Sequence, residues 1–170
     1  MRRASRFTLA TLLLCWTGLP QSLPALAEGS KRDVDFGSIT STARQCSLAR
    51  NGSTRRCTAV ELSQRGNAGL RIRFMGAGEQ PGSSDWITFI ARNRRGIRAL
   101  SCSNGTCEQA VQAWSAEVIS VSIARFDGRG LPISLPDTRS MDGECRIEKS
   151  MIQCDSRSSN GVSLRAVARL

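Results

Sequence analysis

The sequence contains no histidine, and this absence removes most of the chemistry by which proteins catalyse hydrolysis. Histidine is the commonest general base and the middle member of Ser-His-Asp and Cys-His arrangements. A serine–lysine pair would need Lys31 or Lys149, the two lysines of the chain, and we expect both to lie exposed and protonated. We therefore predict no catalytic residues and no enzymatic activity.

Carboxylate pairs are the catalytic groups that remain, because glycoside hydrolysis requires two of them and no histidine. The acidic side chains stand at positions typical of solvated surfaces, with no spacing that marks a pair. A carboxylate-dependent hydrolase of cell-wall sugars stays open as an alternative. Its candidate residues are Asp33, Asp35, Asp85, Glu108 and Glu117.

Tyrosine is absent and aromatic residues make up only 5% of the chain, so stacking platforms for single-stranded nucleic acid are not evident. We predict no specific nucleic-acid partner. Gly128-Arg129-Gly130 lacks the further glycine and the helix start of a phosphate-cradling loop. Neither histidine nor a C-x-x-C spacing is present to hold zinc. We therefore predict no cofactor and no metal.

Long apolar runs are absent except near the N-terminus, where residues 1–27 have the features of an export signal. Three arginines precede an apolar stretch over 7–19, and Ala25-Leu26-Ala27 forms a small-x-small cleavage site. The stretch is shorter than the roughly 20 apolar residues that a bilayer span needs. We predict an exported protein, periplasmic or extracellular, with no transmembrane span in the mature chain.

Cleavage after Ala27 leaves 143 of the 170 residues, which is an ordinary size for one domain. Residues 28–33 are polar and without periodicity, and we expect a flexible leader there. A single domain is expected over 34–170.

Six cysteines remain after removal of the signal, an even number that predicts a disulfide framework in an exported chain. Neighbouring cysteines are placed symmetrically about two-residue centres, and two of these centres are Asn-Gly, the strongest short signal for a tight hairpin. Residues paired directly across such a hairpin lie close enough for a disulfide. The predicted pairs are Cys46 with Cys57, Cys102 with Cys107, and Cys145 with Cys154.

Apolar residues alternate with polar ones along most of the chain, which is the pattern of half-buried strands. Leu70, Ile72 and Phe74 alternate with arginines and predict one core face and one cationic face. The segment 86–92 is apolar on both faces and fits a central strand. Residues 131–135 continue the alternation, and Pro132 assigns them to a sheet edge because proline has no N–H to donate.

One segment shows a different period. Cys107, Ala110, Val111 and Trp114 recur at helical spacing, and Thr106 with Gln109 would form a capping box. We therefore expect a short helix over 107–116. The fold class predicted from these patterns is mainly β, an antiparallel sandwich or open barrel built from hairpins with one short helix and three disulfides.

The net charge of +10 falls to +7 when the signal and its three arginines are removed, so the mature chain favours acidic partners. Two groups of arginines could bind carboxylates or phosphates, although solvated strand faces and protected sheet edges would explain them too. The first group is Arg92, Arg94, Arg95 and Arg98, and the second is Arg55, Arg56, Arg71 and Arg73.

These observations predict a non-enzymatic binding module that presents arginine-rich hairpin loops to an acidic protein or an anionic envelope polymer. An inhibitor of a secreted or envelope hydrolase is an alternative. In that case a clipped loop such as the one between Cys102 and Cys107 would enter the active site of the hydrolase, already held in shape.

Overall fold

The structure is a computed structural model that describes residues 36–66, 69–93, 99–109 and 113–170. Chain contacts group Asp33–Leu170 into one compact unit. The predicted signal (1–27) and leader (28–33) lie outside the described residues. Within the described ranges there is no helix long and apolar enough to cross a membrane.

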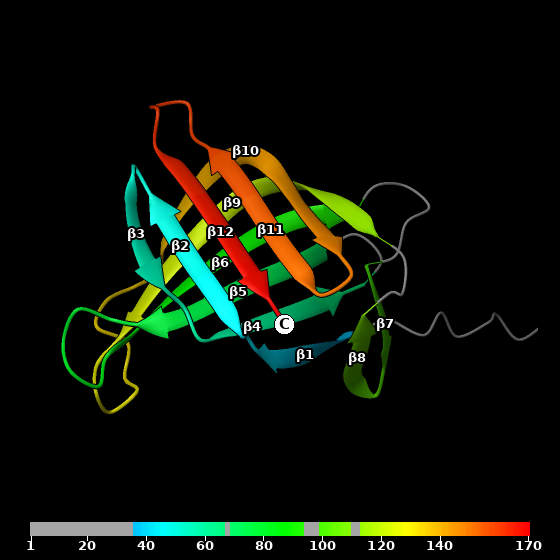
Figure 1. The fold of residues 1–170 in the computed structure, drawn as a ribbon, viewed down its shortest axis with the longest axis horizontal. Helices are drawn as coiled ribbons and strands as arrows, with labels where there is room; N and C mark the ends of the chain where they lie inside the picture. The colour runs from blue at the N-terminus through cyan, green and yellow to red at the C-terminus, as the bar shows by residue number, and fades with distance from the viewer. Residues whose placement is uncertain (1–35, 67–68, 94–98, 110–112) are drawn as a thin grey trace, which may run out of the picture. The chain divides into compact units, whose positions relative to one another are not determined.

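Strands account for the regular structure of the described residues, as the alternating pattern predicts, and they form one curled sheet (Figure 1). Its spatial order is β3-β2-β12-β11-β10-β9-β6-β5-β4-β1-β8-β7, and neighbours are antiparallel except β1 and β8. The strands are β1 (Phe36–Thr42), β2 (Gln45–Arg50), β3 (Ser53–Arg56), β4 (Ala59–Arg65), β5 (Gly69–Ala77), β6 (Ser84–Asn93), β7 (Leu100–Ser103), β8 (Gly105–Gln109), β9 (Trp114–Phe126), β10 (Asp137–Glu148), β11 (Met151–Arg157) and β12 (Ser163–Arg169).

The sheet curls until β3, at one end of the strand order, lies against β5 and makes an open half-barrel. Thr58, which joins β3 to β4, donates its backbone N–H to the Met75 carbonyl of β5 at 2.8 Å and extends the β4–β5 pairing toward β3. Gly76 permits this approach, because a Cβ at Gly76 would lie 2.7 Å from the Arg56 carbonyl oxygen. The open-barrel form of the predicted fold is therefore confirmed.

The core lies on the inner face of the curled sheet. Leu70, Ile72 and Phe74 of β5 are fully buried, while Arg71 and Arg73 between them point to the other face. Phe74 packs edge-to-face on Phe89 of β6, with ring centroids 5.7 Å apart. β6 lies between β5 and β9, which confirms the central position predicted from its two apolar faces.

Three disulfides join the cysteines in the predicted sequential order. Each clips a hairpin: the ladders place Cys102 opposite Cys107 and Cys145 opposite Cys154, and the Cys57 N–H donates to the Cys46 carbonyl. The Asn-Gly turns have the positive φ angles that such tight turns require, 47° and 86° at Asn51-Gly52 and 50° and 84° at Asn104-Gly105.

The third hairpin also turns in two residues. Glu148 pairs with Met151 across Lys149-Ser150, although this pair is a poor match for the common turn type. Lys149 takes a φ of 55°, an unusual conformation for a side-chain-bearing residue. The register set by the flanking disulfide and isoleucine pairs therefore overrides the local preference of the turn.

The helix predicted over 107–116 is wrong. Residues 107–109 belong to β8 and residues 114–116 to β9, while 110–112 lie outside the described residues. Cys107 is held in a ladder opposite Cys102, and Trp114, Ala116 and Val118 are buried in alternation along β9. A period of two, fixed by cross-strand pairing and burial, therefore prevails over the helical spacing of four apolar residues.

The edge strand predicted for residues 131–135 forms no ladder. It makes one isolated bridge, between Phe126 and Pro132, and the segment belongs to the loop between β9 and β10. Its three apolar side chains are exposed: Leu131 by 55%, Ile133 by 57% and Leu135 by 90%. Pro132 and Pro136 have no N–H to donate, so the segment cannot form a regular ladder. Its alternating apolar side chains therefore do not face the core.

Candidate functional site

A pocket of about 360 Å³ opens at one end of the half-barrel. We call this end the mouth: β2, β5, β9 and β11 end there, and β3, β6, β10 and β12 begin there. The pocket lining contains four arginines and two carboxylates, so it is cationic. These charged residues are Arg50, Arg55, Arg56, Arg125, Glu79 and Asp85.

The inner face of β6 changes from apolar to charged as the strand reaches the mouth. Phe89 is fully buried, Ile87 is half-buried in the pocket wall, and Asp85 follows on the same face. The neighbouring strand β9 repeats the change, because Ile123 pairs with Ile87, and Arg125 pairs with Asp85. The pocket therefore has an apolar floor and a charged rim.

The β2–β3 hairpin supplies the facing wall. Leu48 of β2 is buried, and Arg50, two residues on, lies on the same inward face at the mouth. Arg55 of β3 pairs with Leu48 in the ladder and so shares that face. The hairpin tip is tied to β12, since the Ser163 N–H donates to the Asn51 side-chain oxygen at 3.0 Å.

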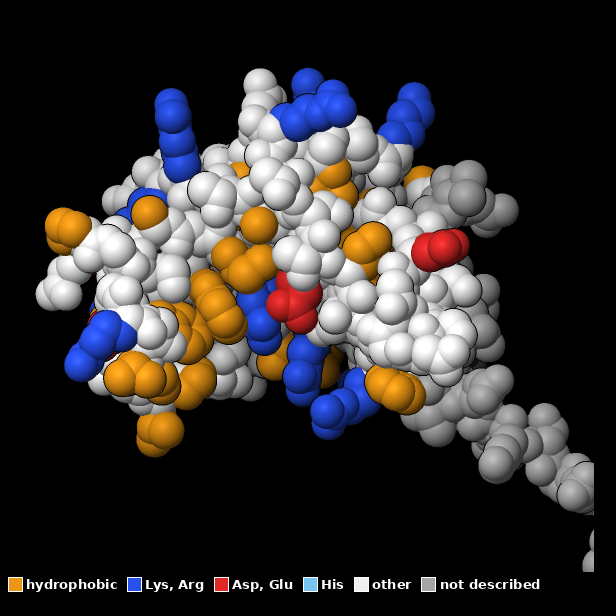
Figure 2. Space-filling model, turned by 90° about the horizontal axis from the view of Figure 1, so that it is seen from below, with side chains coloured by type: hydrophobic (Ala, Val, Ile, Leu, Met, Phe, Trp, Pro, Cys, Tyr) orange, Lys and Arg blue, Asp and Glu red, His pale blue; other side chains and the backbone are white. Residues whose placement is uncertain are grey.

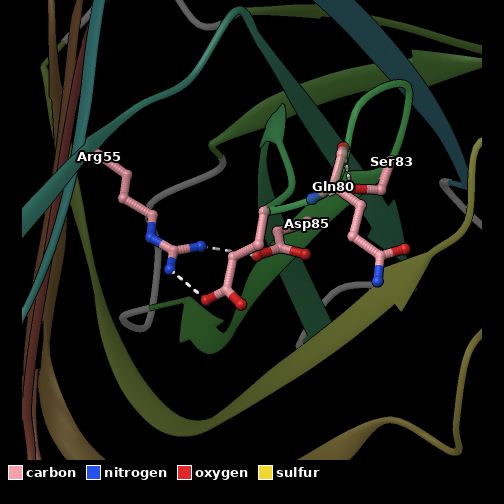
Figure 3. Close-up of polar contacts among 5 residues, drawn as sticks. Arg55, Gln80, Ser83 and Asp85 are labelled. Carbon is pink, nitrogen blue, oxygen red and sulfur yellow. Dashed lines mark hydrogen bonds and ion pairs between the residues drawn. The ribbon is translucent and has the colours of Figure 1, made fainter.

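Arg55 reaches across the pocket to the start of β6 (Figure 3). Its guanidinium donates to Glu79 Oε1 at 2.5 Å and to Asp85 Oδ2 at 3.2 Å. The hydrogen bond from Arg55 lowers the pKa of Glu79, and the charges of Arg55 and Arg125 lower it further. The same pair raises the pKa of Arg55. Both partners are therefore charged at neutral pH.

A second arginine–carboxylate pair lies at the start of β10, beside the mouth. Arg139 donates to both carboxylate oxygens of Asp137, at 3.1 and 2.8 Å. This hydrogen bond lowers the pKa of Asp137, and the nearby positive charges of Arg50 and Arg125 contribute in the same direction. Arg139 thus has a carboxylate partner, whereas among the described residues Arg50 and Arg125 have only longer-range attraction to carboxylates.

The second predicted arginine group is divided between two places. Arg55 and Arg56 line the mouth pocket. Arg73 lies on the outer face of β5, where it donates to Glu61 Oε2 at 2.9 Å and its guanidinium sits 4.7 Å from the centre of the Trp86 ring. Arg71 has the same outward orientation two residues away. Arg73 thus serves the packing of the outer face.

In the first predicted group, only Arg92 lies among the described residues. It stands exposed near the end of β6 and pairs with Gly69 and Glu117 in the ladders. Arg94, Arg95 and Arg98 lie outside the described residues.

The candidate carboxylates of the hydrolase alternative are likewise dispersed. Asp33 and Asp35 lie outside the described residues, while Glu108 of β8 and Glu117 of β9 are exposed. Asp85 is in the mouth, next to Glu79 through their shared partner Arg55. Among the described residues, no three histidine, cysteine or acidic side chains gather as a metal site.

Arg50, Arg125 and Glu79 are site residues that the sequence analysis missed. A signal for two of them is present. Arg50 continues the inward positions of Cys46 and Leu48, and Arg125 continues those of Val121 and Ile123. A charged residue in phase with buried ones marks the place where a strand leaves the core.

An exposed apolar loop adjoins the pocket. The β9–β10 loop projects from the same end of the sheet as the β5–β6 loop (Figure 1), and the two touch where Gly128 meets Pro81 and Gly82. Figure 2 shows hydrophobic side chains gathered at this end, with Lys and Arg side chains beside them. We call residues 131–135 the apolar finger.

The mouth therefore combines guanidinium groups, an apolar floor and a projecting apolar finger, an arrangement that can hold an anionic group beside hydrocarbon. No family model, curated protein or solved structure matches this chain.

Proposed function

We propose that this protein is an exported, non-enzymatic binding module whose mouth holds an anionic partner. The supporting observation is the cationic pocket, in which Arg50 and Arg125 face an apolar floor with no direct ion pair of their own among the described residues. Guanidinium groups bind carboxylates and phosphates with two parallel hydrogen bonds. A partner's acidic group would supply the acceptors that these two side chains lack.

Export is part of the proposal, and the disulfides support it. Disulfides persist in oxidising compartments outside the cytoplasm. Three of them clip hairpins in this domain, and Cys145 and Cys154 are fully buried. The charged mouth is thereby carried on a rigid support, which reduces the entropy lost on binding.

Binding accounts for the two carboxylates of the mouth better than hydrolysis does. A glycosidase needs one carboxyl group with a raised pKa to act as general acid. Arg55 instead lowers the pKa of Glu79 and also donates to Asp85. The carboxylates hold Arg55 across the pocket and so position the wall of the binding site.

The test uses a fluorescently labelled decaglutamate peptide and compares its Kd for the wild type and for Arg50→Gln with Arg125→Gln. We expect the double variant to bind about tenfold more weakly, because charge-assisted hydrogen bonds to the peptide are lost. Binding should also weaken as the salt concentration rises.

The matched control is Arg146→Gln with Arg169→Gln, which removes the same charge from exposed positions on β10 and β12 at the end away from the mouth. The control should change the Kd less than twofold. Absence of peptide binding, or equal weakening by the two double variants, would contradict a specific site at the mouth.

A further inference from the structure

We infer that the anionic partner of the mouth is a bilayer rich in anionic phospholipid, into which the apolar finger inserts. This inference rests on the proposed function, since the mouth arginines would bind the phosphates. The finger adds a second chemistry. Leu131, Ile133 and Leu135 are exposed by 55%, 57% and 90%, although apolar side chains of this size normally lie inside a fold.

Hydrogen bonds around Asp127 fix the turn that leads into the apolar finger. Asp127 accepts hydrogen bonds from the N–H groups of Arg129 and Leu131, both at 2.9 Å. The Asp127 N–H donates back to the Leu131 carbonyl, and the Ile133 N–H donates to the Arg125 carbonyl, each at 2.9 Å. The exposure is therefore built into the backbone of the loop.

Arginines surround the base of the finger. Arg125 precedes it, Arg129 lies in its turn and Arg139 follows it at the start of β10. Arg129 pairs with Asp127 and Arg139 with Asp137, so Arg125 is the one of these three that has no ion pair among the described residues. Long guanidinium side chains can reach phosphate groups while neighbouring apolar side chains lie deeper in the acyl region. An anionic bilayer offers these two environments side by side, so its charge and its polarity gradient match the mouth.

An aromatic pair lies at the same level. Trp86 of β6 packs against Phe126, the last residue of β9, with ring centroids 4.2 Å apart and ring planes tilted by 45°. Trp86 is half-buried on the outer face, where the Arg73 guanidinium lies 4.7 Å from the centre of its ring. Tryptophan is enriched at membrane–water interfaces because its ring has an apolar body and a polar N–H. The pair would lie at the headgroup level when the finger is inserted.

The experiment measures partition of the full mature protein onto vesicles of phosphatidylcholine alone and of phosphatidylcholine with phosphatidylglycerol. The variants are Leu131→Ser with Ile133→Ser and Leu135→Ser, and, separately, Arg50→Gln with Arg125→Gln. We expect binding to the anionic vesicles only. The serine variant should lower the partition constant about a hundredfold, and the arginine variant should lower it about fivefold per arginine.

Insertion has its own readout. In Leu135→Trp, the emission of the added tryptophan should shift to shorter wavelength on anionic vesicles and be quenched by lipids brominated in the acyl chains. All three finger positions are exposed, so these variants should keep the wild-type circular dichroism spectrum. Emission that stays at the wavelength of water-exposed tryptophan would overturn insertion.

The outcomes separate this inference from the proposed function. If decaglutamate binds at the mouth but anionic vesicles do not, the membrane is the wrong partner and anion binding stands. If vesicles bind equally well to the serine variant, the contact is electrostatic and the finger does not insert. If the serine variant abolishes binding and the arginine variant does not change it, the anion site fails instead. Self-association that the serine variant abolishes would identify a second copy as the occupant, overturning the inference.

Discussion

The inner face of β10 and β11 and the inner face at the mouth are built from the same alternating pattern, yet they end in different chemistry. In the first region Cys145, Ile147, Ile152 and Cys154 are all buried, and a disulfide joins the two strands. At the mouth the inward positions become half-buried isoleucines and then arginines and carboxylates. The curled sheet thus encloses a disulfide-linked core in one region and leaves charged side chains in an open pocket in the other.

The largest expected effect comes from removing the clip of the buried region. Cys145→Ala with Cys154→Ala should lower the free energy of unfolding by about 3 to 5 kcal/mol, because the unfolded chain gains entropy and the core loses two packed sulfur atoms. Guanidinium unfolding followed by circular dichroism measures the change. Cys102→Ala with Cys107→Ala removes a disulfide that spans 5 residues, against 9 for Cys145–Cys154. It should therefore lower the free energy of unfolding by less.

A glycine in the same region gives the next effect. A Cβ at Gly143 would lie 2.0 Å from the Asp155 carbonyl oxygen, so Gly143→Ala must push β10 and β11 apart. We expect a loss of about 2 kcal/mol in the free energy of unfolding. Gly69→Ala is the control, since its nearest contact would be 3.4 Å away. Equal losses in the two variants would show that close strand packing at Gly143 is unimportant.

The hairpins of the buried region can be predicted from the sequence. The cysteine symmetry and the Asn-Gly turns predict the three clipped hairpins, because both signals are local and depend on direct cross-strand pairs. The strand of Leu70, Ile72 and Phe74 is predicted for the same reason. Strand order cannot be obtained in this way, since no local pattern brings β2 beside β12 or β3 against β5.

The mouth was predictable only in part. Arg55 and Arg56 stand out as neighbouring charges, but Glu79 and Asp85, the partners of Arg55, meet it only after the sheet has curled. For Leu131 and its neighbours, the sequence pattern predicts a strand that the fold does not contain. Their alternation resembles a strand, and only the three-dimensional fold reveals that no core lies opposite them.

A charge on the outer face should contribute to stability and little to binding. Glu61→Gln removes the half-buried ion pair with Arg73, whose guanidinium also contacts Trp86. We expect a loss of about 1 kcal/mol in the free energy of unfolding and no change in decaglutamate binding. Asp155→Asn weakens a more exposed pair with Arg165 and should cost less. Weaker peptide binding by Glu61→Gln would extend the binding surface beyond the mouth.

The smallest effect concerns a titration in the mouth. Arg55→Gln should raise the pKa of Glu79 toward the ordinary glutamate value, because the hydrogen bond and charge that lower it are removed. The folded-state pKa is depressed in the wild type, so this contact stabilises the fold above the ordinary carboxyl pKa and is lost as the pH falls through the depressed value. NMR titration of the Glu79 side chain measures the shift. An unchanged Glu79 titration would contradict the ion pair across the pocket.

The central claim is that anions bind at the mouth, and backbone amide chemical shifts recorded during a decaglutamate titration test it most directly. The account predicts changes confined to the β2–β3 hairpin, the β5–β6 loop and the mouth ends of β9 and β10, and their loss in Arg50→Gln with Arg125→Gln. Changes centred on the outer face or the β10–β11 turn, or unaffected by the double variant, would contradict it.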